Sequence, residues 1–186
     1  MIKYLGDGGD VVVPDGITKI ADKAFENCAN VTSVVLPNGV TTIGNSAFYG
    51  CKQLSTIHFP DTLTTIGTFA FAWCDSLTDV LLPSSMTEIG ASAFATSGLT
   101  SVIIPNSVIS IGDEAFLQCK NLTTVEIPDS VTKIGNDAFR LCTKLENINL
   151  PNSIHEIGAD AFGNCDALTS IVLPNGITEI KEGTFS

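Results

Sequence analysis

Hydrophobic and polar positions along the chain repeat at an interval of 23 residues. The prolines mark this interval, because successive prolines are 23 residues apart except for one step of 22. The prolines are Pro14, Pro37, Pro60, Pro83, Pro105, Pro128, Pro151 and Pro174. A phenylalanine series and an isoleucine series keep the same spacing, from Phe25 to Phe185 and from Ile20 to Ile180. A repeat of this length is typical of a solenoid.

Each repeat predicts a strand, a turn, a second extended step and a helical turn. In residues 54–60, Ile57 and Phe59 alternate with polar residues, as in a half-buried strand. Proline then ends the strand because it has no N–H group, and Asp or Asn before Gly or Ser supplies the turn. The V-T-x-I step predicts a second short strand. The G-x-x-A-F step allows about one helical turn, with Asn45 or Ser46 as its cap.

A single coil of this kind cannot bury its apolar side, so neighbouring coils must stack into a parallel sheet over a continuous core. We predict about eight coils that form a single domain over residues 1–186, without a linker. Residues 1–13 depart from the pattern and are interpreted as an atypical first coil or cap. The chain stops within a repeat, so we expect an uncapped C-terminus that continues into a longer protein or associates end to end.

The repeat motif resembles that of a known family. L-x-x-L-x-L followed by P-x-S-V-T-x-I-G-x-x-A-F-x-x-C, at 23 residues, is similar to the BspA-like, Treponema-pallidum-type leucine-rich repeat and covers nearly the whole chain. The resemblance implies a right-handed superhelix with a parallel β-sheet on its concave side, and short strands and helical turns on the other side. It also implies a bacterial cell-surface or secreted protein that adheres to host extracellular proteins.

Six cysteines each follow a repeat phenylalanine by three residues, which places them in one column. They are Cys28, Cys51, Cys74, Cys119, Cys142 and Cys165, and Ser97 takes this position in the shortened repeat. Neighbouring coils allow one disulfide within each group of three, but a zinc site needs about four converging ligands. A nucleophile would be needed only once. We interpret the column as small hydrophobic residues of the core, with disulfides as the alternative.

Net charge and composition exclude several classes of partner. The net charge of −11 argues against nucleic acid and anionic membranes, because both attract clusters of Lys and Arg. No apolar run approaches the ~18 residues needed to insert into a membrane. The first residues are too polar for a signal peptide, so the surface location follows only from the resemblance.

Residues with catalytic or metal-binding chemistry are few. His58 could approach Asp79 in the next coil, which is a slender basis for a Ser-His-Asp site. The acidic pair Asp113 and Glu114 is interpreted as the start of a helical turn. Residues 5–10 hold two aspartates among glycines, but calcium-binding repeats of that kind occur in series. We therefore predict a protein without catalytic residues, metal or cofactor.

The outward strand residues two positions before each proline are the predicted partner-binding residues. The column consists of Val35, His58, Leu81, Ile103, Glu126, Asn149 and Val172. It places Leu81 beside Ile103, and exposed apolar neighbours with a polar rim often mark a partner site. The alternative is that β-forming residues simply suit an exposed strand.

These patterns predict a non-enzymatic protein-binding or adhesion module of a bacterial cell-surface or secreted protein. The alternative is a structural spacer or a self-associating stalk, because the surface is repetitive and carries few distinctive side chains. Carbohydrate binding ranks third, since Trp73 and Tyr49 are among the few aromatic residues that could stack on sugars.

Overall fold

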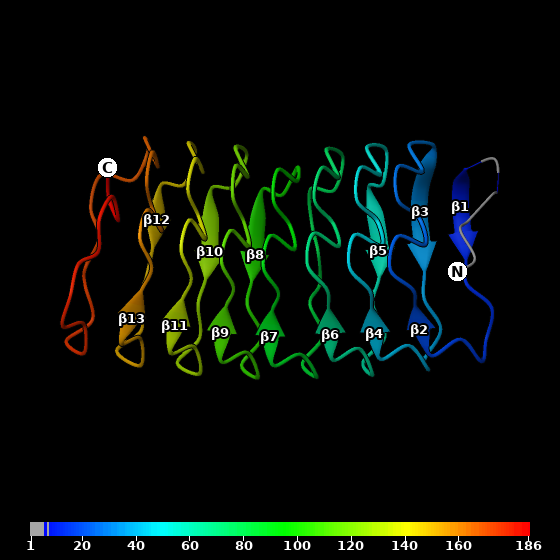
Figure 1. Cartoon of the computed structure of the whole chain (residues 1–186), viewed down its shortest axis with the longest axis horizontal. Helices are drawn as coiled ribbons and strands as arrows, with labels where there is room; N and C mark the ends of the chain where they lie inside the picture. The colour runs from blue at the N-terminus through cyan, green and yellow to red at the C-terminus, as the bar shows by residue number, and fades with distance from the viewer. Residues whose placement is uncertain (1–5, 7) are drawn as a thin grey trace.

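The computed structural model describes residue 6 and residues 8–186, and it shows a solenoid whose coils stack along one axis (Figure 1). Thirteen short strands form within the described residues, and none of these residues is helical. The strands lie in two rows that run the length of the molecule, one above the other in Figure 1. The solenoid with parallel strands predicted from the 23-residue period is confirmed.

The first strand row precedes the repeat prolines. It contains β1 (Gly9–Val12), β3 (Val31–Val35), β5 (Thr56–His58), β8 (Ser101–Ile103), β10 (Thr124–Glu126) and β12 (Asn147–Ile148). These strands form two parallel sheets, in the orders β1-β3-β5 and β12-β10-β8. Neighbouring strands pair one repeat apart, as Val34 does with Ile57. Because side chains alternate along a strand, these two are buried while Val35 and His58 are exposed.

The second strand row comes from the V-T-x-I step, and it confirms the predicted second strand. Its members are β2 (Lys19–Ile20), β4 (Thr42–Ile43), β6 (Thr65–Ile66), β7 (Glu88–Ile89), β9 (Ser110–Ile111), β11 (Lys133–Ile134) and β13 (Glu156–Ile157). The sheet orders are β2-β4-β6 and β13-β11-β9-β7. The isoleucine of each strand is buried, so this row closes the opposite side of the core.

The predicted helical turn is wrong, and a ribbon of turns occupies the G-x-x-A-F step instead. Within this ribbon, the Phe48 N–H donates to the Ala70 carbonyl of the next coil at 2.8 Å, whereas the Ala47 N–H donates to Gly44 in its own coil at 3.3 Å. A helix would satisfy every N–H within the coil. Alternate N–H groups here point along the solenoid axis and form a third backbone ladder.

The ribbon requires left-handed backbone at two positions per coil, four residues apart. The non-glycine residues with positive φ have values of 52–62°. They are Lys23, Asn27, Ser46, Phe69, Trp73, Ser92, Thr96, Glu114, Gln118, Asp137, Leu141, Asp160 and Asn164. Such a conformation is uncommon for residues with a side chain. It persists here because the bonds to the next coil hold the backbone in place.

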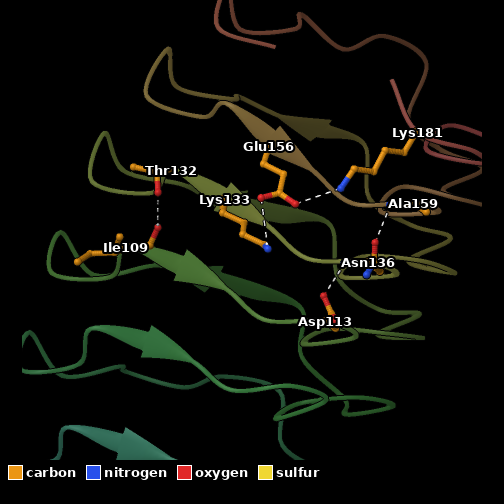
Figure 2. A network of polar contacts seen from close by, with 8 residues as sticks. All are labelled: Ile109, Asp113, Thr132, Lys133, Asn136, Glu156, Ala159 and Lys181. Carbon is orange, nitrogen blue, oxygen red and sulfur yellow. Dashed lines mark hydrogen bonds and ion pairs between the residues drawn. The ribbon is translucent and has the colours of Figure 1, made fainter. Parts of the chain in front are cut away.

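A ladder of side chains joins the ribbons of neighbouring coils (Figure 2). Asp113 Oδ1 accepts a hydrogen bond from the Asn136 N–H at 2.8 Å, and Asn136 Oδ1 accepts one from the Ala159 N–H at 2.9 Å. Asn45, predicted to cap a helix, likewise accepts from the Thr68 N–H of the next coil at 2.9 Å. Asp113 therefore links coils, and the acidic pair that it begins does not open a helix.

Figure 2 shows three further contacts between coils on the side of the second row. Thr132 Oγ1 donates to the Ile109 carbonyl at 3.3 Å. Glu156 accepts from Lys181 at 3.0 Å and from Lys133 at 3.3 Å, and these hydrogen bonds lower the pKa of the Glu156 carboxyl. All three side chains remain partly exposed, so the ion pairs contribute little stability compared with the backbone ladders.

A stack of phenylalanine rings fills the centre of the solenoid. It consists of Phe25, Phe48, Phe71, Phe94, Phe116, Phe139, Phe162 and Phe185. Neighbouring ring centroids lie 4.8–5.8 Å apart, and their planes are within 10° of parallel. Every repeat thus contributes one aromatic side chain to a single continuous core.

The cysteine column lies beside this stack, which confirms the interpretation as core residues. Cys51, Cys74, Cys119, Cys142 and Cys165 are buried free thiols, and Cys28 is half-buried. The Cys51 thiol donates to the Phe25 carbonyl of the preceding coil at 3.0 Å. Burial raises the pKa of Cys51 to about 12 and that of Cys119 to about 11. These thiols therefore stay protonated, which makes them poor nucleophiles.

We expect Phe116→Ala to lower the free energy of unfolding by roughly 3–5 kcal/mol, because it removes a fully buried ring from the stack. Urea denaturation followed by circular dichroism measures the loss. Phe185→Ala is the matched control, since Phe185 is 40% exposed and stacks on one neighbour only, Phe162. Equal losses for the two variants would contradict the central position of the stack.

Alkaline pH should destabilise the protein through its buried thiols. The folded pKa of Cys119 is about 11, above its ordinary value of 9.0, so folding favours the protonated thiol. The contribution of the protonated Cys119 thiol to the free energy of unfolding is fully present below pH 9.0 and is lost as the pH rises through about 11. The free energy of unfolding should therefore decline less steeply between these values in Cys119→Ala than in wild type. Parallel pH profiles of the two proteins would argue against the assignment.

Candidate partner-binding face

All seven residues predicted to contact a partner are exposed on the outer side of the first strand row. They are Val35, His58, Leu81, Ile103, Glu126, Asn149 and Val172. Strand pairing places Val35 beside His58 and Ile103 beside Glu126. Leu81 is 86% exposed and Ile103 is 62% exposed. The structure thus forms the predicted column, and its role in binding a partner stays a prediction.

The first strand row is interrupted at the coil that contains Leu81. Residues 79–82 form no strand, and no backbone hydrogen bond joins them to either neighbouring coil. Just before them, the Thr78 carbonyl still accepts the Thr100 N–H at 2.9 Å. The interruption lies beside the single 22-residue step between Pro83 and Pro105. It separates the sheet that ends at β5 from the sheet that ends at β8.

An open groove lies at this interruption, between residues 79–84 and residues 101–107, and we call it the central groove. Its volume is about 670 Å³. Its apolar lining comes from Val80, Leu81, Leu82, Val102, Ile103 and Pro105. Sequence reasoning predicted that Leu81 and Ile103 would be neighbours, but it missed the groove. The 22-residue step between Pro83 and Pro105 marks the place of the groove in the sequence.

The first strand row carries acidic side chains and no Lys or Arg within the described strands. Asp10 accepts hydrogen bonds from Ser33 at 2.6 Å and from Thr32 at 3.1 Å, and these bonds lower the pKa of its carboxyl. Asp79 and Glu126 are exposed on the same row. The face is therefore negative at neutral pH, which favours a partner surface that carries basic residues.

The candidate chemical groups do not converge in the described part of the chain. The His58 side chain makes no hydrogen bond there, and Asp79 instead accepts from Thr78 at 3.0 Å. The described residues contain no group of three or more His, Cys, Asp or Glu placed to hold a metal ion. In the calcium-like segment 5–10, residues 5 and 7 lie outside the described residues, as do residues 1–5 of the predicted cap.

The aromatic candidates for sugar binding lie on the ribbon of turns and not on the strand row. Trp73 is 45% exposed, and Phe69, four residues earlier, is 41% exposed. Tyr49 is half-buried in the preceding coil. These side chains are therefore separate from the column of predicted partner-binding residues.

In the part of the chain that the structure describes, no helix is long and apolar enough to cross a membrane.

Comparison with known structures identifies close relatives of this fold. A leucine-rich repeat protein of Treponema pallidum has 37% identity and a TM-score of 0.86, over 91% of this chain and 82% of that one. A leucine-rich cell-surface protein of Faecalibacterium prausnitzii has 38% identity and a TM-score of 0.83, over 91% of this chain and 48% of that one. The chain thus spans about half the length of the second relative.

A third structure, a leucine-rich repeat protein of Bacteroides ovatus, has 29% identity and a TM-score of 0.76, over 95% of this chain and 54% of that one. A search of curated proteins found no match. The model of the BspA type leucine-rich repeat region matches six copies, in residues 9–123 and 109–186. The chain therefore belongs to the BspA type leucine-rich repeat family.

Proposed function

We propose that this chain is a non-enzymatic protein-binding module of a bacterial cell-surface or secreted protein, and that it acts in adhesion. The family supports a module for protein interaction in general, and the similar Faecalibacterium protein is described as a cell-surface protein. The single observation that carries the proposal is the exposed apolar pair Leu81 and Ile103 on the outer side of the first strand row. Exposed apolar patches with a polar rim favour contact with another protein.

The physical properties of this face suit recognition of a folded or extended protein. The backbone ladders hold the strands on both sides of residues 79–82 in one shape, so little conformational entropy is lost there when a partner binds. Acidic residues around the apolar pair would orient a basic partner and raise its association rate. We propose a host extracellular protein as the partner.

A structural spacer or stalk is the second candidate. It is favoured by the three backbone ladders, which run from coil to coil and give the solenoid a stiff, regular form. A spacer needs only this stiffness, so it would tolerate changes in the outward column that a binding module would not. The two functions therefore differ in the expected effect of surface substitutions.

The test is a pull-down of purified host extracellular proteins with the wild-type chain and with Leu81→Lys/Ile103→Lys. We expect the double variant to lose at least about tenfold in affinity, because it replaces apolar contact area with charge that must be desolvated. Ile17→Lys/Ile109→Lys is the matched control, since both isoleucines are exposed outside the first strand row. Circular dichroism confirms that the variants are folded.

Full binding by the Leu81→Lys/Ile103→Lys variant would place the site outside the first strand row. Equal losses in both double variants would point to a general effect of added lysines. If the wild-type chain captures none of the proteins, the adhesion proposal fails and the spacer becomes the better interpretation.

A further inference from the structure

The central groove has the size and lining of a binding site for a side chain of another protein. Its volume is about 670 Å³, and it opens to the surface between residues 79–84 and residues 101–107. Leu82 and Val102 are buried beside it, while Leu81 and Ile103 stand exposed. An apolar side chain that entered the groove would remove these exposed groups from water.

The backbone along one wall of the groove has unused hydrogen-bonding groups. Residues 79–82 make no backbone hydrogen bond to β5 on one side or to β8 on the other. In the neighbouring part of the row, the equivalent groups pair with the next coil, as the Ile104 N–H does with the Glu126 carbonyl at 3.0 Å. Backbone groups that the neighbouring coils leave unpaired can hydrogen-bond with an extended peptide that lies across the groove.

A serine in the groove lining also has an unsatisfied side chain. Ser107 Oγ is buried and has no hydrogen-bond partner. In another coil the equivalent hydroxyl of Ser153 donates to the Val131 carbonyl, at 2.7 Å. Ser130 also lacks a partner, but it does not line the groove. The Ser107 hydroxyl is therefore a buried polar group beside the groove that the preceding coil leaves unsatisfied.

The charge around the groove selects among peptides. Asp79 lies in the lining, and Glu126 is next to Ile103 in the strand row. The lining contains no Lys or Arg. A peptide with basic residues on either side of its apolar side chain would complement these carboxylates, whereas an acidic peptide would be repelled.

We propose that the central groove binds an extended segment of a partner protein in which an apolar side chain lies between lysine or arginine residues. The apolar side chain fills the groove, the peptide backbone pairs with residues 79–82, and the basic residues lie near Asp79 and Glu126. This proposal rests on the proposed protein-binding function and narrows it to one site and one chemistry of partner.

The experiment titrates the ¹⁵N-labelled chain with the peptide acetyl-Lys-Lys-Thr-Leu-Thr-Lys-Lys-amide and follows amide chemical shifts. We expect saturable shifts at residues 79–82 and 101–107. Two control peptides separate the contributions: one replaces each lysine by glutamate, and the other carries N-methyl groups on both threonines. Each should bind about tenfold more weakly or worse, which corresponds to losing the charge attraction or one good hydrogen bond.

Variants of the chain provide the second arm of the test. Leu81→Lys should weaken binding of the basic peptide by about tenfold or more, because it places a like charge and a polar group in the groove. Ile109→Lys adds the same charge at an exposed isoleucine next to the second strand row, and it should leave peptide binding unchanged. Preserved amide shifts away from the substitution show that each variant is folded.

Absence of saturable shifts at millimolar basic peptide, shifts confined to other residues, or equal binding of the basic and acidic peptides would overturn the proposal. Equal binding of the N-methylated peptide would also overturn it, since the groove would then act as a general apolar site. A host protein captured in the pull-down together with any of these results would leave the binding function standing and reject only the groove.

Discussion

The hydrogen bond from one coil to the next is the interaction on which this structure depends. Each coil leaves alternate N–H and C=O groups directed along the solenoid axis, and only a neighbour in the correct register can satisfy them. The close approach of the coils also determines which positions must be glycine. A Cβ atom at Gly135 would lie 2.5 Å from the Asp113 nitrogen of the preceding coil. The 23-residue period therefore reflects the spatial fit between neighbouring coils more than a conformational preference within one coil.

This dependence explains which parts of the fold could be predicted from the sequence. The strands before the prolines and the buried Phe116 and Cys119 followed from the period and the alternation of apolar residues. The ribbon of turns did not, because the G-x-x-A-F pattern suits a helical turn equally well when a coil is considered alone. Glu114, with φ of 58°, takes a conformation that is stabilised by the neighbouring coil, and no local pattern reveals that.

The candidate binding face was predictable to a similar extent. The outward column needs only the strand pattern and the register, so the sequence predicts that Leu81 and Ile103 are neighbours. The central groove depends on which backbone bonds fail to form between residues 79–82 and the adjacent coils. Whether those bonds form depends on the geometry of three neighbouring coils together, which the pattern of one repeat does not contain. The missing partner of Ser107 is likewise visible only in three dimensions.

The buried thiols have a consequence for the environments in which such a module can work. Because Cys74 and Cys142 are enclosed in the core as free thiols, the fold draws none of its stability from oxidised cysteine. Glutathione, peroxide and thiol-disulfide exchange enzymes cannot reach sulfur atoms at this depth without first opening the solenoid. The same architecture therefore suits anaerobic and oxygenated habitats alike, and additional coils can lengthen it without any need for disulfide-forming machinery.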